Sequence, residues 1–285
     1  MSETIDIDHL KGWIGRSEEA VDTIDPRLVR SLRATLDLEP GEATLGEDAP
    51  LCIHWCLAPP IVANAATGPD GHPARGDFLP PVPLPRRMWA GGQIAFRSSL
   101  KIGDAVRRVS TIERVEMKTG RSGRLLFVSV RHAFDTTRGL CVEERQDIVY
   151  RDMPPAGEPA APPPSLPDLP QATIARDFEP SELALFRYSA LTFNGHRIHY
   201  DRRYCKDEEG YPGLVVHGPL QATLLAHLAA EAIGSAPSEF SYRGVNPLFD
   251  DDGLKIEARA DGDGGWSLRA VNRAGATTME ATASG

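Results

Sequence analysis

The chain has 285 residues, enough for two small domains, and its 41% hydrophobic and 25% charged residues are ordinary for a folded globular protein. Its formal net charge of −9 disfavours a nucleic-acid partner, because an acidic surface repels phosphate backbones. We also expect no membrane partner, since no stretch of 18 continuous apolar residues could span a bilayer and the polar start MSETIDIDHLKG is unlike a signal peptide.

The first predicted element is a helix within DPRLVRSLRATLDL, residues 25–38. Asp25 is a favourable N-cap, and Pro26 suits the first helical position because the N–H that proline lacks would be unbonded there. Apolar side chains recur at helical spacing at Leu28, Val29, Leu32 and Leu36. The pattern therefore predicts an amphipathic helix.

The next segment, CIHWC, alternates in a way that predicts a short strand with Cys52, His54 and Cys56 on one side. Two cysteines four residues apart could suggest a metal site, but no second cysteine pair completes one, so we favour structural burial. The other cysteines are Cys141 and Cys205. Four cysteines at irregular spacing predict free thiols and a cytoplasmic location.

Residues 65–87, AATGPDGHPARGDFLPPVPLPRR, are rich in turn formers and predict a long surface loop. Strand-like alternation follows in QIAFRSSLKI, RLLFVSVRHAF and CVEERQDIVYRD. Two basic stretches, LPRRMW and DAVRRVS, are candidate patches for a phosphorylated ligand.

A proline-rich segment, PPAGEPAAPPPSLPDLP, covers residues 154–170 and holds eight of the chain's 24 prolines. Proline fixes φ and removes a donor, so we expect an extended linker and no folded element. This linker would divide the chain into an N-terminal unit, 1–153, and a C-terminal unit, 171–285.

The second half is predicted to contain a polar, irregular segment, one long apolar helix and several strands. Gly218-Pro219 suits the start of the helix and Gly234 its end. The strand-like runs are EFSYRGVNPLF, LKIEARAD, WSLRAVNRAG and TTMEATAS, with turns such as DGDGG between them. This order predicts a curved antiparallel sheet wrapped around a buried helix.

The stretch FRYSALTFNGHRIHYD, residues 186–201, concentrates polar groups directly ahead of that helix. Together with YPGLVVHGPLQATLLAHL it resembles the MaoC-like hot-dog hydratases and dehydratases. The similarity is greatest to the branch with mesaconyl-C4-CoA (3-methylfumaryl-CoA) hydratase, itaconyl-CoA hydratase and 3-hydroxyacyl-thioester dehydratases. RMWAGG, FVSVRH and ERQDIVYR extend the resemblance into the first half.

The resemblance implies an α+β double hot-dog fold, with a curved antiparallel sheet around a central helix in each half and the polar motif in the second half only. It implies an acyl-CoA thioester as substrate, with coenzyme A as part of that substrate. Hot-dog units commonly pair through sheet edges, so a homodimer is plausible. Nothing in the sequence calls for a metal, nicotinamide or flavin, and no GxGxxG follows a predicted strand.

The resemblance also assigns catalytic roles for a hydro-lyase of the enoyl-CoA hydratase type. His199 would be the base, since an imidazole titrates near working pH. The best-known members carry aspartate where this chain has Asn194; an asparagine cannot accept a proton, so we expect it to position the water. The Gly218 N–H, at the positive end of the helix, would hold the thioester oxygen.

The remaining candidate residues are expected to bind substrate. Arg197 could hold the free carboxylate of a mesaconyl or itaconyl group, contact coenzyme A phosphates, or simply pair with Asp201. Asp201 could instead handle a proton or orient a histidine. His196 could line the pocket or pack, and as half of a zinc pair it lacks a nearby third ligand in sequence. His217 could cap the helix or form a pocket wall.

The favoured reaction is hydration of a short branched dicarboxylyl-CoA, mesaconyl-C4-CoA or itaconyl-CoA, to citramalyl-CoA, or the reverse. A 3-hydroxyacyl-thioester dehydratase of longer acyl chains is the nearest alternative. A hot-dog acyl-CoA thioesterase would use similar pocket physics but cleave the C–S bond. The missing aspartate also leaves open a non-catalytic acyl-CoA binder.

Overall fold

A computed structural model describes residues 5–120, 123–152 and 172–285. The elements of the first half are α1 (Ile7–Lys11), β1 (Ser17–Thr23), α2 (Pro26–Thr35), the 3₁₀ helices η1 (Ile53–Cys56) and η2 (Asn64–Ala66), β2 (Arg86–Phe96), β3 (Ala105–Gly120), β4 (Gly123–Thr136) and β5 (Gly139–Arg151). The predicted start of α2 is confirmed, because Pro26 is its first residue and Asp25 Oδ1 accepts the Leu28 N–H at 2.8 Å.

The elements of the second half are β6 (Ile174–Phe178), α3 (Glu182–Leu191), η3 (Arg197–His199), α4 (Arg202–Asp207), α5 (Gly218–Ile233), β7 (Glu239–Gly244), β8 (Leu254–Ala260), β9 (Trp266–Val271) and β10 (Thr277–Ser284). Both predicted ends of the long helix are confirmed. Helix α5 begins at Gly218, and its C-cap Gly234 has φ of 84°, a left-handed conformation that favours glycine. The four strands predicted after this helix are also confirmed, as β7 to β10.

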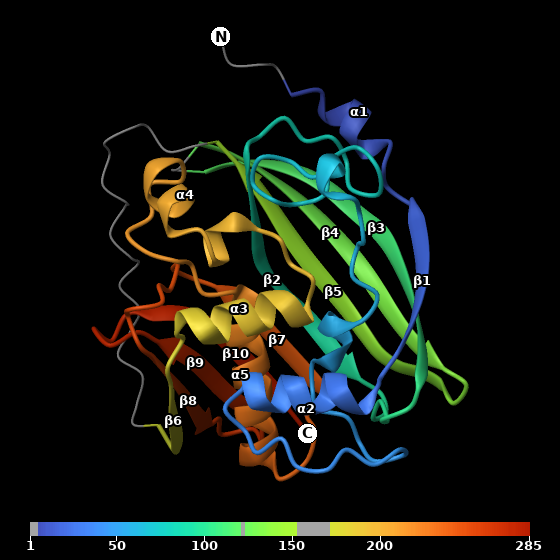
Figure 1. Cartoon of the computed structure of the whole chain (residues 1–285), viewed down its shortest axis with the longest axis vertical. Helices are drawn as coiled ribbons and strands as arrows, with labels where there is room; N and C mark the ends of the chain where they lie inside the picture. The colour runs from blue at the N-terminus through green and yellow to red at the C-terminus, as the bar shows by residue number, and fades with distance from the viewer. Residues whose placement is uncertain (1–4, 121–122, 153–171) are drawn as a thin grey trace.

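The strands form one antiparallel sheet in the order β1-β3-β4-β5-β2-β7-β10-β9-β8-β6 (Figure 1). The first five strands in this order come from the first half of the chain and the last five from the second. The halves join where β2 pairs with β7, from Gly91 opposite Arg243 to Ala95 opposite Glu239. The larger hydrophobic core continues across this junction. Two units of the predicted α+β kind therefore share a single sheet.

The two halves cover the inner face of the sheet differently. Helix α5 has sixteen residues and packs against β8, β9 and β10, with α3 and α2 in front of it in Figure 1. Helix α2 has only ten residues and packs against α3 and one end of the first half's sheet. The rest of that inner face is covered by α1 and by residues 78–84. A full-length central helix is thus present in the second half, and a shorter helix plus a loop replaces it in the first.

This covering role corrects the prediction that residues 65–87 form a surface loop. Val82 and Leu84 are each only 2% exposed and pack against β3, β4 and β5. The prolines of this segment remove backbone donors, so residues 78–84 form no regular element. Their apolar side chains nevertheless cover the part of the sheet that a longer helix would otherwise bury.

The strand predicted for CIHWC is also wrong. Ile53–Cys56 is a 3₁₀ helix, and the preceding Cys52 has φ of 63°, which no strand accommodates. The predicted burial is confirmed, since Cys52 and Cys56 are both buried. Strand-like alternation was also predicted through QIAFRSSLKI, residues 93–102. Strand β2 covers only the first part of this segment, because it ends at Phe96.

All four cysteines are free and buried. The predicted linker 154–170 lies entirely within the undescribed range 153–171, so the proposed domain boundaries stay a prediction. Within the described parts of the chain, no helix combines the length and the apolar composition needed to cross a membrane.

Candidate active site

The polar motif lies between α3 and α4, where a loop from the first half closes over it. The backbones of Gly71 and Gly195 touch: a β-carbon on Gly71 would come within 2.0 Å of the Gly195 carbonyl oxygen. Next to this contact, the Arg197 N–H donates to the Asp70 carbonyl at 2.9 Å. Two glycines are required here because any side chain would separate the two segments.

His199 is buried with one ring nitrogen committed to the backbone. Its Nδ1 lies 2.7 Å from the Val215 carbonyl oxygen, and because a carbonyl only accepts, Nδ1 carries the proton and Nε2 keeps a free lone pair. Burial lowers the pKa of His199 to about 4, although the bond to Val215 acts in the opposite direction. The side chain is therefore a neutral base at physiological pH.

His217 links this base to the start of α5. It is the N-cap of the helix, is fully buried, and its ring stacks on that of His199 at 3.6 Å and 18°. Its Nε2 lies 2.9 Å from the Ser189 hydroxyl. Burial, with a further contribution from His199, lowers the pKa of His217 well below its ordinary value. The motif and the helix N-terminus are thus brought together through one stacked pair of neutral imidazoles.

His196 meets the edge of the His199 ring and connects it to His72, which the sequence did not single out. The His196 ring lies 5.4 Å from that of His199 and 4.0 Å from that of His72, in the loop before β2. His72 Nδ1 is in turn 3.0 Å from Asp70 Oδ2. Burial and the neighbouring rings lower the pKa of His196, and burial lowers that of His72. No periodic signal could have found Asp70 and His72 in a turn-rich stretch.

Asn194 has only part of its amide available. Its Oδ1 accepts the His196 backbone N–H at 3.0 Å, and the backbone N–H of Asn194 donates to the Ser189 carbonyl. The side-chain oxygen is therefore engaged in holding the turn, and the Nδ2 group remains to donate a hydrogen bond.

Arg197 and Asp201 are engaged with each other. Arg197 Nη2 and Nε donate to Asp201 Oδ2 at 2.8 and 3.1 Å, and Nη1 donates to the Pro69 carbonyl. The guanidinium also lies over the Tyr204 ring at 4.1 Å. Asp201 Oδ1 accepts the Tyr204 N–H as the N-cap of α4. These contacts favour the pairing alternative for Arg197 over binding of a substrate carboxylate, and they engage both carboxylate oxygens of Asp201.

Gly218, at the first position of α5, faces an aromatic wall from the first half. A β-carbon on Gly218 would lie 2.7 Å from Trp89 Cε3. Trp89 stacks on Tyr242 at 4.6 Å and meets the edge of Trp55 at 5.3 Å. Both neighbours donate to the buried Glu144, Trp55 Nε1 at 3.0 Å and the Tyr242 hydroxyl at 3.2 Å. The wall beside Gly218 is therefore anchored to one buried carboxylate.

Asp70, His72 and His196 are the group among the described residues that could hold a metal ion, since their ligand atoms lie within 4.8 Å of one another. The two imidazole rings lie 4.0 Å apart with their planes inclined by 39°. His72 Nδ1 already lies 3.0 Å from Asp70 Oδ2, so two of the three candidate ligands are engaged with each other.

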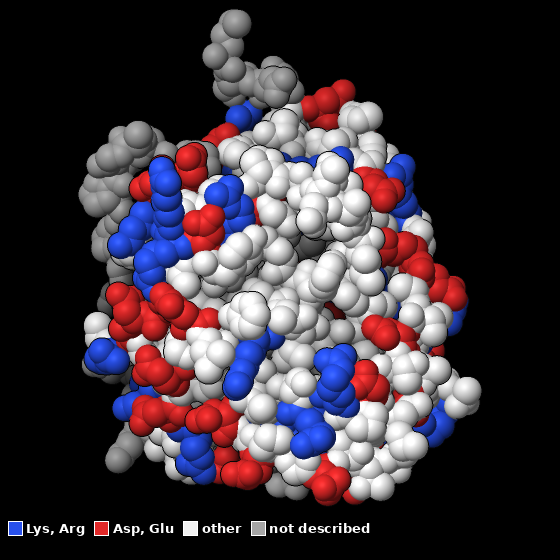
Figure 2. Space-filling view, viewed as in Figure 1, with Lys and Arg blue, Asp and Glu red and all other residues white. Residues whose placement is uncertain are grey.

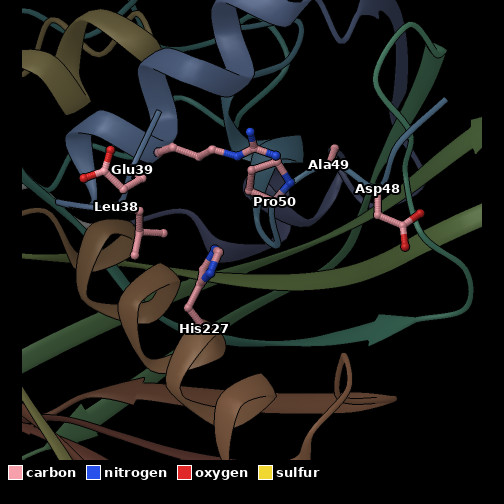
Figure 3. Close-up of a pocket in the computed structure, with 7 residues that line it drawn as sticks. Leu38, Glu39, Asp48, Ala49, Pro50 and His227 are labelled. Carbon is pink, nitrogen blue, oxygen red and sulfur yellow. The ribbon is translucent and has the colours of Figure 1, made fainter. Parts of the chain in front are cut away.

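The molecular surface is hollowed near this region. Figure 2 shows a hollow where, in Figure 1, the segment between α3 and α5 approaches the loop that precedes β2. A separate open pocket of about 240 Å³ lies elsewhere, between Arg33 at the end of α2 and His227 of α5 (Figure 3). That pocket contains none of the predicted site residues.

Three comparisons identify relatives of this chain. The sequence profile of the family "Hydroxyacyl-thioester dehydratase type 2" matches residues 52–250. A mesaconyl-C(4)-CoA hydratase of Chloroflexus aurantiacus is 46% identical over 272 residues, covering 95% of each chain.

Among solved structures, HtdX of Mycobacterium tuberculosis superposes with a TM-score of 0.66 at 22% identity, covering 95% of this chain and all of HtdX. A second protein of that bacterium has a double hot-dog fold. It superposes with a TM-score of 0.55 at 12% identity, covering 97% of this chain and 96% of its own. The predicted double hot-dog fold is confirmed.

Proposed function

The chain belongs to the hydroxyacyl-thioester dehydratase type 2 family, and on that premise we propose that it hydrates the double bond of mesaconyl-C4-CoA to give citramalyl-CoA. It is an acyl-CoA hydratase of the hydro-lyase class. The observation that carries the proposal is the neutral, buried His199, whose Nδ1 is fixed by Val215 and whose ring stacks on the residue that caps α5.

His199 is the base in this proposal. Its Nε2 takes a proton from water as the water oxygen bonds to the β-carbon, and the electrons of the double bond move toward the thioester oxygen. The α-carbon of the resulting enolate then takes a proton back from the imidazolium, so the imidazole ends neutral. The Asn194 amide, through its free Nδ2 donors, orients the water.

Gly218 holds the developing negative charge. Its N–H is one of the first in α5, has no partner within the helix and lies at the positive end of the helix dipole. A donor of this kind is typically worth about 10²–10³ in rate. Any side chain at 218 would collide with Trp89, so glycine is what lets the first turn of α5 lie against this wall.

The test is a panel of mesaconyl-C4-, itaconyl- and crotonyl-CoA, with products identified by mass spectrometry. We expect a mass gain of one water on mesaconyl-C4-CoA, loss of enoyl-thioester absorbance and no thiol release with DTNB. Release of free thiol would establish the thioesterase alternative instead. A long-chain 3-hydroxyacyl-CoA is added to the panel to test the dehydratase alternative. Its turnover, with none of the short dicarboxylyl esters, would establish that alternative.

We further infer that the protein works without a separate cofactor, in the cytoplasm and as a homodimer. The four buried free thiols support a reducing compartment. The free sheet edges, β1 and β6, support pairing between copies. Light scattering of the purified protein tests the dimer, with a monomeric mass as the contrary result.

A further inference from the structure

Arg87 is a cation on the inner wall of the site with no acid beside it. It lies in β2 directly opposite Tyr150 of β5. Among the residues that the structure describes, no carboxylate oxygen lies within 4.0 Å of its guanidinium. Its neighbours are engaged: Arg86 pairs with Glu209 at 3.0 Å, and Arg75 donates to the carbonyls of three loop residues. A half-buried arginine left without an anion is suited to bind one.

Two buried donors near Arg87 also lack an acceptor. The hydroxyl of Tyr150, which is fully buried, and Nε1 of Trp89 donate to no acceptor. The Tyr150 hydroxyl interacts with the guanidinium of Arg87, which can only donate, so its own proton stays unbonded. A buried donor left unbonded is destabilising, so such donors commonly mark a site that a ligand fills. Residues paired across antiparallel strands, and residues two apart on one strand, point to the same face, so Arg87, Tyr150 and Trp89 share the inner face.

Arg87, Tyr150 and Trp89 lie close to the residues that carry the proposed reaction. Trp89 is the residue that a β-carbon on Gly218 would strike. Arg87 lies two residues before it on β2, about 7 Å along the strand. Burial is the main cause of the lowered pKa values of His72 and His196, and the charge of Arg87 lowers both further, as expected for a cation near those rings.

We propose that Arg87, with the Tyr150 hydroxyl, binds the free carboxylate of the substrate's acyl group. The proposal deepens the proposed function and rests on it. In a trans-dicarboxylyl thioester the two carbonyl carbons are about 4 Å apart, the span of one trans planar unit. A thioester oxygen held at Gly218 therefore leaves the carboxylate within reach of an arginine side chain that starts about 7 Å away along β2. The basic stretch LPRRMW then serves a carboxylate and not a phosphate.

The kinetic test uses two substrates that differ only at this group: mesaconyl-C4-CoA and 3-methylcrotonyl-CoA, in which a methyl replaces the carboxylate. For Arg87→Gln we expect kcat/KM for mesaconyl-C4-CoA to fall by about 100-fold while that for 3-methylcrotonyl-CoA is unchanged. Tyr150→Phe should shift the same ratio by about tenfold. The matched control is Arg197→Gln, which removes an arginine already paired with Asp201 and should leave the ratio unchanged.

An equal fall for both substrates in Arg87→Gln would overturn the proposal, as would a change of ratio in Arg197→Gln alone. A binding measurement separates this from failure of the proposed function. By calorimetry, the wild-type protein should bind methylsuccinyl-CoA at least tenfold more tightly than isovaleryl-CoA, and Arg87→Gln should abolish the difference. Both ligands are saturated and cannot be hydrated, so this result holds even if mesaconyl-C4-CoA is not turned over. Equal binding of the two by the wild-type protein would rule out a carboxylate site.

Discussion

Gly218 and Trp89 are in contact so close that the space between helix α5 and strand β2 has no room for one more carbon atom. A β-carbon at 218 would lie 2.7 Å from Trp89 Cε3, well inside normal van der Waals contact. The position of the helix N-terminus is thus set by a side chain from the other half of the chain.

The first prediction concerns this contact. Gly218→Ala should lower kcat by about 10²-fold, because the new methyl group displaces either Trp89 or the N–H that holds the thioester oxygen. The rate is followed by enoyl-thioester absorbance. Gly262→Ala is the matched control, since a β-carbon there meets nothing within 4 Å. Undiminished turnover by Gly218→Ala would exclude Gly218 from the site.

The second prediction concerns the pH dependence of the rate. The base must be neutral, and burial lowers the pKa of His199 to about 4. The activity should therefore stay constant as pH falls through 6.5, the ordinary value for histidine, and decline about tenfold per unit only below about 4. A rapid-mixing pH profile, restricted to times before acid unfolding, measures this. An acid limb near 6.5 would contradict a desolvated His199.

The third prediction concerns stability in acid. His72, His196, His199 and His217 all have lowered pKa values in the folded protein, with burial as the first cause. Below about pH 6.5 the unfolded chain therefore binds more protons than the folded one, so the free energy of unfolding falls as pH falls.

The slope of that decline is about 1.4 kcal/mol per pH unit for each histidine that protonates only on unfolding. Denaturant titrations between pH 7 and 4 measure it. His196→Gln should reduce the slope, whereas substitution of the exposed His9 by glutamine should not. A stability that is flat over this range would mean that the cluster is hydrated.

The fourth prediction separates the roles of Asn194 and His199. His199→Ala should lose about 10²–10⁴ in kcat, because no other group takes the proton. Asn194→Ala should lose about tenfold, the worth of one hydrogen bond to water. Asn194→Asp should recover that loss, since one carboxylate oxygen can accept the His196 N–H while the other accepts a hydrogen bond from the water. Near-normal turnover by His199→Ala would show that the base has been misassigned.

The fifth prediction concerns Asp70, His72 and His196, which lie close enough together to hold a cation. We expect purified protein to carry no stoichiometric metal and to keep full activity in EDTA, because Asp70 Oδ2 is already bonded to His72 Nδ1. Elemental analysis by mass spectrometry checks the metal content. Activity lost to EDTA and restored by Zn²⁺ would assign the cluster a metal-binding role.

The sequence was informative wherever a local rule decides the structure. Asp25 and Gly234 mark helix ends through backbone chemistry that acts over a few residues, and period-two alternation located β4, β5 and β7 to β10. The motif around His199 was recognised from residue types at fixed spacing. Such signals need no knowledge of the rest of the fold.

What the sequence did not predict depends on contacts between distant segments. Asp70 and His72 reach His196 only because Gly71 lies against Gly195, 124 positions away along the chain, a contact that leaves no periodic trace. In the sequence, Arg87 and Trp89 were only part of the basic stretch LPRRMW. The pairing of β2 with β5 shows that they lie on the same face of the sheet as Tyr150. CIHWC alternates like a strand, but the positive φ of Cys52 turns it into a 3₁₀ helix.

The junction between β2 and β7 has a consequence for how specificity can change. In the proposed mechanism, proton transfer is confined to residues of the second half, whereas the groups that we place around the acyl chain lie on β2 and β5 of the first. Substitutions at Arg87, Trp89 and Tyr150 should therefore retarget the protein to a different thioester while its chemistry stays intact. A variant library limited to those three positions is the natural place to seek new substrates.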